Sequence, residues 1–279
     1  MSAPGTGIDR AHPASGAASA PAASGQVGDV IARGRTVDYL YDASDVGDPT
    51  RAYEGRAFVP AGSAGDAPLP LVVFLHGLNR ALVAHRWLGG GDEGAVRRCL
   101  GVWVARGALP PLVLAGPGSV QPAAVSGGAS FPVLDVDHFI ELTEAALAGV
   151  ARIDRTRIVV AGHSGAGCSA SGGLVAAARA RARPLALLSI DTCMPVPLAE
   201  ALGGGPPETH VVVTWQTVSW KRDFGGFQRA FARAKEKRPP AAGVLRELDA
   251  LPAMPRAHDA TVTQTIEKWL PRILPPVAR

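Results

Sequence analysis

The chain contains few aromatic residues, which make up only 5% of its 279 positions. Its net charge of +4 reflects a small excess of lysine and arginine over acidic residues. The densest basic group, Arg179, Arg181 and Arg183, has no aromatic residue interleaved with it. Because nucleic-acid-binding surfaces combine basic clusters with stacking residues, the sequence predicts no nucleic-acid partner. The arginines are interpreted as a solvated surface.

Cysteine is also scarce, with only Cys99, Cys168 and Cys193 and no pair at CxxC spacing. An odd, sparse set of this kind predicts neither a disulfide framework nor a zinc site. The favoured interpretation is that all three are buried free thiols. The alternative is a Cys168–Cys193 bridge, since the fold inferred below brings both residues near the same end of a sheet.

Long apolar runs are absent, and none reaches the ~18 residues needed to span a bilayer. Residues 1–29 are rich in Ala, Ser, Gly and Pro and lack a basic region followed by an apolar core. They do not resemble a signal peptide and are predicted to form a flexible low-complexity tail. A cytoplasmic protein is therefore expected, with secretion as the alternative. The chain is long enough for one large α/β domain or two small ones, and residues 30–279 are predicted to form a single α/β domain.

What the chain does contain is a regular alternation of apolar, strand-like runs and helical segments. Strands are expected at residues 35–42, 51–60, 71–77, 109–118, 153–165 (after a turn), 185–191 and 210–216. Helices are expected at residues 91–107, 133–152, 167–182, 224–237 and 260–270. This order predicts a mostly parallel sheet with helices on both faces, and the first two strands form an antiparallel lead-in.

One strand-like run, residues 159–167 (VVAGHSGAG), ends in a serine among small residues. A serine hydroxyl is a weak nucleophile that must be presented openly and deprotonated by a base. Every residue within two positions of Ser164 is small except His163, as a strained strand-to-helix turn requires. The pattern resembles the G-x-S-x-G nucleophile elbow of the α/β-hydrolase superfamily, with Ala166 at the last position and Gly167 after it. The alternative is a glycine-rich turn with a helix-capping serine.

The stretch from residue 135 to 167 carries the most specific part of this resemblance. It is similar to polyhydroxybutyrate-depolymerase-like and feruloyl-esterase-like members, in which a helix near an Asp leads to an ID-x-x-R-I turn and then to the elbow. Asp154 and Arg157 are the structural pair of that turn. The resemblance implies an α/β-hydrolase fold over about residues 35–275, with a mostly parallel sheet between two helical layers.

The same resemblance implies the other site residues. The loop after the run LVVFLHG corresponds to the family's oxyanion loop, so the backbone N–H groups of Leu78 and Gly165 are the implied oxyanion donors. His76 is then structural. His258 follows a proline-containing loop and precedes the last helix, where the family places its base. The alternative is a solvated loop histidine.

The acid is the least defined member, because no carboxylate directly follows the run HVVVTWQ, the commonest family position. Asp191 ends the preceding strand, and Asp223 lies several residues beyond HVVVTWQ. Asp191 is preferred because a buried strand end is rigid, and Asp223 is kept as the alternative acid. Asp259 adjoins His258 and cannot readily turn back onto the same ring.

The resemblance thus implies a serine hydrolase of carboxylic esters that works through a Ser-His-Asp triad and an acyl-enzyme, without metal or organic cofactor. Two alternatives stay open: a peptidase or acyltransferase on the same fold, and a non-catalytic hydrolase-fold binding protein. The short segment 192–209 predicts no large lid and hence an open cleft for small or polymeric esters. Trp215 and Trp220 are candidates either for its lining or for the core. The sequence does not indicate an oligomeric state.

Overall fold

The computed structural model describes most of the chain between residues 33 and 276. The described ranges are 33–41, 53–63, 67–79, 83–89, 95–118, 129–132, 134–220, 223–252, 254 and 256–276. The expected tail, residues 1–29, lies outside them.

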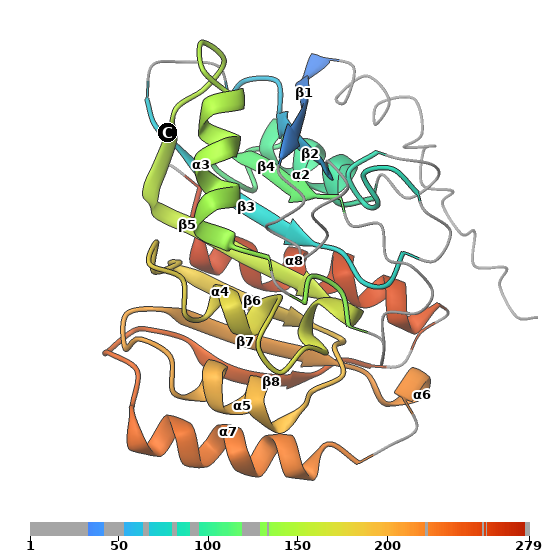
Figure 1. Ribbon diagram of the computed structural model, residues 1–279, viewed down its shortest axis with the longest axis vertical. Coiled ribbons are helices and arrows are strands. Elements are labelled where there is room, and N and C mark those ends of the chain that lie inside the picture. The colour runs from blue at the N-terminus through green and yellow to red at the C-terminus, as the bar shows by residue number, and fades with distance from the viewer. Residues whose placement is uncertain are drawn as a thin grey trace, which may run out of the picture.

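One sheet of eight strands organises the described part of the chain (Figure 1). The strands are β1 (Arg35–Tyr41), β2 (Tyr53–Val59), β3 (Leu69–Leu75), β4 (Val113–Pro117), β5 (Ile153–His163), β6 (Ala186–Ile190), β7 (His210–Trp215) and β8 (Arg246–Ala250). Their order is β1-β2-β4-β3-β5-β6-β7-β8. The pairs β1–β2 and β2–β4 are antiparallel and all others are parallel, which confirms the predicted lead-in.

Helices cover both faces of this sheet. On one face lie α3 (Val136–Ala146), α4 (Leu174–Ala177), α5 (Val196–Gly203) and α7 (Gly225–Lys237); on the other lie α2 (Ala95–Ala105) and α8 (Ala257–Ile273). Side chains of β3 alternate between the two layers: Leu71 and Val73 pack under α3, while Val72 and Phe74 pack under α2 and α8. Burial on both faces explains why the central strands are continuous apolar runs.

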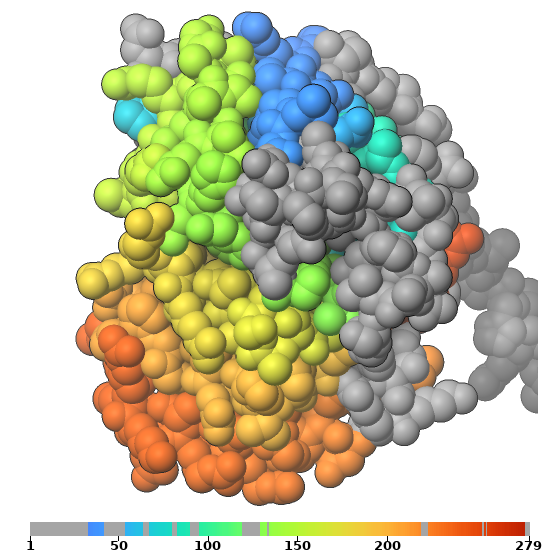
Figure 2. Space-filling model, viewed as in Figure 1, coloured from blue at the N-terminus to red at the C-terminus, as the bar shows by residue number. Residues whose placement is uncertain are grey.

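The face that carries α3, α4, α5 and α7 is the one turned to the viewer in Figure 2. Within the described residues no helix is long and apolar enough to cross a membrane.

Several elements differ from the prediction, among them the short helix α6 (Thr217–Trp220), which was not expected. The helix expected at 167–182 is reduced to α4, because Gly173 has φ +52° and a Cβ on Gly172 would lie 2.3 Å from the Phe131 carbonyl oxygen. Helix α5 occupies part of the segment 192–209 and was not predicted. Strand β8 was also missed, since its sequence RELDA is mostly charged and lies at the sheet edge, where only one neighbour is needed.

The parallel strands place several polar residues at one edge of the sheet. Ser164 follows β5, Asp191 follows β6 and Gln216 follows β7. Helix α8 begins at Ala257, earlier than predicted, so His258 lies in its first turn instead of in a preceding loop. Side chains far apart in sequence therefore meet at the carboxyl ends of the strands, the usual ligand edge of such sheets.

Candidate active site

Ser164 lies at a sharp turn between β5 and a short 3-10 helix, η3 (Ser164–Gly167). Its φ of +54° is a left-handed conformation that non-glycine residues rarely adopt. The turn is held by close packing: a Cβ on Gly162 would lie 2.6 Å from Leu174 Cγ, and one on Gly77 would lie 2.7 Å from Ser164 Cβ. Backbone strain at a site packed this tightly is characteristic of functional residues.

The departure from the family pattern at Ala166 is accommodated locally. Ala166 is fully buried, and a Cβ on Gly173 would lie only 2.1 Å from its carbonyl oxygen. Gly167 instead faces Thr192, where a Cβ would lie 2.6 Å from Cγ2. The small residues that this turn needs are thus distributed over Gly162, Gly167 and Gly173, and the first two belong to the predicted motif.

The structure brings Ser164, His258 and Asp191 together. His258 Nε2 lies 2.9 Å from Ser164 Oγ, and His258 Nδ1 lies 2.5 Å from Asp191 Oδ2. A carboxylate can only accept, so Nδ1 carries the proton and Nε2 is left to accept the serine hydroxyl proton. The His258 side chain is 32% exposed and that of Asp191 is fully buried. This arrangement can deprotonate the hydroxyl of the half-buried Ser164.

The two other carboxylates considered in the sequence analysis, Asp223 and Asp259, make other contacts than Asp191 does. Asp223 accepts a hydrogen bond from Gly225 N at 2.7 Å, at the start of α7. It is exposed and acts in a local turn. Asp259 lies beside His258 in the first turn of α8, with its backbone N–H bonded to Arg256 O. Neither has a hydrogen bond to the imidazole among those described.

Asp191 is held by residues that the sequence analysis did not single out. Gln216 donates twice, from its backbone N to Oδ1 at 3.2 Å and from Nε2 to Oδ2 at 2.8 Å. The Gln216 amide oxygen in turn accepts from Val218 N at 2.8 Å. Asp191 N donates to Thr214 O, and Asp191 itself has φ +45°. A polar residue directly after β7 was the only sequence signal for Gln216.

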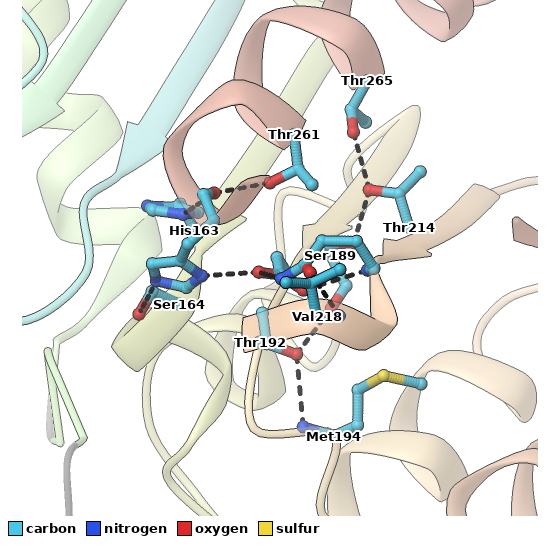
Figure 3. Close-up of polar contacts among 12 residues, drawn as sticks. His163, Ser164, Ser189, Thr192, Met194, Thr214, Val218, Thr261 and Thr265 are labelled. Atoms are coloured by element: carbon cyan, nitrogen blue, oxygen red, sulfur yellow. Dashed lines mark hydrogen bonds and ion pairs between the residues drawn. The ribbon is translucent and has the colours of Figure 1, made fainter. Parts of the chain in front are cut away.

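Hydroxyl groups join the strands under the acid to the helix that carries the base (Figure 3). Thr214 Oγ1 on β7 lies 2.6 Å from Thr265 Oγ1 on α8. Ser189 Oγ on β6 lies 3.0 Å from Thr192 Oγ1. Thr214 Oγ1 also lies 3.4 Å from the Ser189 carbonyl oxygen, so these buried contacts connect β6, β7 and α8 into one hydrogen-bonded unit.

Two further histidines lie buried beside the serine. Burial lowers the pKa of His76 to about 4, and burial together with the neighbouring His258 lowers the pKa of His163 to about 3. Since a carbonyl oxygen only accepts, His76 Nδ1–H donates to Gly77 O at 2.6 Å. His76 therefore orders the loop in front of Ser164.

That loop carries one implied oxyanion donor. Leu78 is half-buried, and its carbonyl oxygen accepts a hydrogen bond from Arg86. The other implied donor, Gly165, is buried in η3, and its carbonyl accepts from Ser130 N at 2.8 Å and Cys168 N at 3.1 Å. Gly77 of this loop lies against Ser164, since an added Cβ would come within 2.7 Å of Ser164 Cβ, which sequence spacing alone did not reveal.

A disulfide joins Cys168 to Cys193, with their Cα atoms 4.9 Å apart. The alternative of a Cys168–Cys193 bridge is therefore confirmed, and the favoured interpretation of these two residues as free thiols is wrong. Cys99 is the free cysteine, and burial raises its pKa. The sequence could not show that the turns after β5 and β6 lie within bonding distance. The bridge links a position four residues after Ser164 to one two residues after Asp191.

Trp215 belongs to the core, being 6% exposed and packed edge-on against Phe224. The side chain of Trp220 lies outside the described residues. Among the residues that the structure describes, no group of three or more His, Cys, Asp or Glu could hold a metal ion.

A mostly parallel sheet that ends in a strained serine turn is the architecture of an α/β-hydrolase. No family model matches the sequence, and a search of curated proteins finds no match. Solved structures do match. A ferulic acid esterase aligns with a TM-score of 0.63 and 13% identity, over 88% of this chain and 99% of the other.

Two other matches have the same fold. The S-formylglutathione hydrolase of Agrobacterium tumefaciens has a TM-score of 0.58 and 13% identity, over 88% of this chain and 96% of its own. The enterobactin esterase of Shigella flexneri has a TM-score of 0.59 and 18% identity, over 85% of this chain and 59% of its own. The chain therefore has the α/β-hydrolase fold, which confirms the fold expected from the sequence.

Proposed function

We propose that this protein is a serine hydrolase of carboxylic esters. The observation that carries the proposal is the continuous hydrogen-bonded line from Ser164 Oγ through the His258 imidazole to the buried Asp191 carboxylate. A nucleophile, a base and an orienting acid in this order are what acyl transfer through serine requires. Esterases of the same fold support the choice of ester over other carbonyl substrates.

In the proposed reaction, Ser164 Oγ attacks the ester carbonyl carbon while His258 Nε2 takes the hydroxyl proton. The backbone N–H groups of Leu78 and Gly165 stabilise the negative oxygen of the tetrahedral intermediate. His258 then gives its proton to the departing alcohol, which leaves an acyl group on Ser164. A water molecule, deprotonated by His258, attacks this acyl-enzyme and releases the carboxylic acid.

Asp191 keeps the imidazole in the tautomer that can accept from serine. Its side chain is fully buried and Gln216 donates to both of its oxygens, so it is held ready for His258. By analogy with other triads, losing the acid costs about 10⁴-fold in kcat because the wrong tautomer is then favoured.

Fluorophosphonate labelling followed by peptide mass spectrometry tests the proposal. We expect the label on Ser164 in the wild type, and none there in S164A or H258A. D191N is expected to lose about 10³–10⁴-fold in kcat on a p-nitrophenyl ester, and the matched D223N to stay within twofold. An unlabelled Ser164 in folded wild type, or equal activity of D191N and D223N, contradicts the assignment.

The class of ester is left broad, because the similar structures are named for ferulic acid, S-formylglutathione and enterobactin. Hydrolysis is distinguished from acyl transfer by adding an alcohol or amine acceptor during turnover. A hydrolase of esters or peptides releases the free acid as the main product, whereas an acyltransferase forms the acceptor adduct; a peptidase is recognised by turnover of the matching amide.

For the compartment we propose an oxidising environment, in place of the cytoplasm expected from the sequence. The Cys168–Cys193 disulfide supports this, since disulfides persist mainly outside the reducing cytosol. Trapping free thiols by alkylation in protein taken from its native cells tests it. One modified cysteine, Cys99, is expected; three modified cysteines would restore the cytoplasmic assignment.

A further inference from the structure

His163 is the last residue of β5 and directly precedes Ser164, and its side chain contacts the base, His258. Its Nε2 lies 3.0 Å from the backbone carbonyl oxygen of His258. The two imidazole rings also lie against each other in a tilted arrangement, with centroids 4.5 Å apart and planes inclined by 38°. Trp87 packs edge-on against the His163 ring at 5.5 Å.

The hydrogen bond fixes the state of the His163 ring. A carbonyl oxygen cannot donate, so Nε2 must carry the proton and donate it. The residue is 1% exposed, and its pKa of about 3 keeps the ring neutral at any working pH. Nδ1 is then a bare acceptor, and among the described residues it has no hydrogen-bond partner. Among the described residues, the hydrogen bond to the His258 carbonyl oxygen is therefore the only one that the His163 ring makes.

The accepting carbonyl belongs to the first turn of α8. It receives a second side-chain bond from Thr261 Oγ1 at 2.7 Å, from within the same helix. Among the hydrogen bonds described here, the one from His163 therefore links this carbonyl to the strand that carries the nucleophile. One residue, bonded covalently to Ser164, thus reaches the backbone of the base that must accept the Ser164 proton.

We propose that His163 is a positioning residue, whose Nε2–H holds the His258 backbone so that the imidazole stays within hydrogen-bond distance of Ser164. The proposal rests on the proposed function, because it needs His258 to act on Ser164. A misplacement of about 1 Å in a reacting group can lower a rate about 10²-fold, so a single bond of this kind has a measurable effect.

Glutamine and methionine separate the hydrogen bond from simple packing. Both side chains fill a similar volume, but only the glutamine amide can donate, and it reaches about as far from the backbone as the imidazole Nε2. If the ring only fills space, H163Q and H163M should behave alike. If the donor matters, H163Q should retain activity that H163M loses.

The experiment compares kcat and KM of wild type, S164A, H163Q and H163M on a p-nitrophenyl ester, with urea unfolding midpoints as the measure of folding. We expect a kcat about 10–100-fold lower in H163M with KM within twofold of wild type, and a kcat within about threefold in H163Q. Fluorophosphonate labelling of Ser164 should slow in H163M to the same degree. Equal kcat values in H163Q and H163M would overturn the proposal.

If H163M does not fold, H163N replaces it, since its amide is as polar as that of glutamine but too short to reach the carbonyl. We then expect H163N to lose about tenfold or more in kcat relative to H163Q, and equal values would again overturn the proposal. Failure of the proposed function looks different. In that case wild type and S164A would be equally inactive, whereas the positioning role is judged only against an active wild type.

Discussion

The two halves of the candidate site are fixed in different ways. On the acid side, Asp191 is held by hydrogen bonds from Gln216, and hydroxyl contacts tie the strands below it to α8. On the nucleophile side, close packing holds Ser164 in place. Because Gly77 and Gly162 have no side chains, neighbouring groups can pack directly against the turn. Hydrogen bonds orient a charged group that must not move, while close packing forces a strained backbone that would otherwise relax.

This comparison implies different responses to substitution. A change on the nucleophile side should act by steric displacement, with a large effect on rate. A change on the acid side should act by leaving a buried charge with fewer donors, with an effect on stability as well. The four changes below test this division, from the largest expected effect to the smallest.

Gly77→Ala should give the largest effect. The added Cβ would lie 2.7 Å from Ser164 Cβ and 3.1 Å from its Oγ, so the serine or the loop must shift. We expect kcat on a p-nitrophenyl ester to fall by about 10²-fold or more, with a smaller change in the urea midpoint. Gly226→Ala is the matched control, because nothing lies within 4 Å of the added methyl group. If kcat of G77A stayed within threefold of the wild-type value, close packing at Gly77 would not explain how Ser164 is held.

The disulfide is the one covalent tie between the two halves. It closes a sequence separation of 25 residues, for which loss of the cross-link is expected to cost about 3 kcal/mol of unfolding free energy. The double variant C168S/C193S should therefore unfold at lower urea than wild type, and reducing agent should have the same effect on wild type but none on the variant. C99S is the control, with an expected change below about 1 kcal/mol.

Gln216→Met tests the acid side. It retains side-chain bulk but removes the Nε2 donor that lies 2.8 Å from Asp191 Oδ2, together with the amide oxygen that accepts from Val218 N, while the backbone donor to Asp191 remains. Removing one hydrogen bond to a buried charged group costs about 1.5–3 kcal/mol. We expect a loss of this size in urea unfolding, together with a moderate fall in kcat. A stability equal to wild type would mean that the backbone N–H alone suffices.

Sequence reasoning located the members of the site that depend on local pattern. The small residues around Ser164 mark a strained turn, and strand ends at 163 and 190 place Ser164 and Asp191 on one edge of a parallel sheet. Asp191 could be preferred over Asp223 because it directly ends a buried run, whereas Asp223 lies in a polar segment that turns out to begin α7.

Other members depend on tertiary contacts that no local pattern encodes. Gly77 matters because of what lies opposite it, and Cys168 and Cys193 pair because two turns approach each other. Gln216 is polar at a strand end, but its role as a hydrogen-bond donor becomes clear only from its contact with Asp191. Likewise β8 is charged enough to resemble a loop and becomes a strand by pairing with β7.

Acid sensitivity should come in part from the nucleophile side, where His76 and His163 are buried with pKa values of about 4 and 3. In the unfolded chain both return to about 6.5, so between roughly pH 4 and 6.5 the unfolded state binds more protons than the folded state. Their stabilising effect is complete above pH 6.5 and is lost as the pH falls toward the folded values. Each fully responsive histidine contributes a slope of about 1.4 kcal/mol per pH unit.

Urea unfolding at pH 7, 6 and 5 measures this slope, in a range where the carboxyl groups of Asp38 and Asp154, whose pKa values are lowered, remain ionised. His163→Gln removes one of the two deeply buried imidazoles. Its stability should therefore fall by about 1.4 kcal/mol less per pH unit than that of wild type near pH 5. An unchanged slope would mean that other titrating groups cause the pH dependence of stability. It would also mean that the folded protein accommodates a protonated His163.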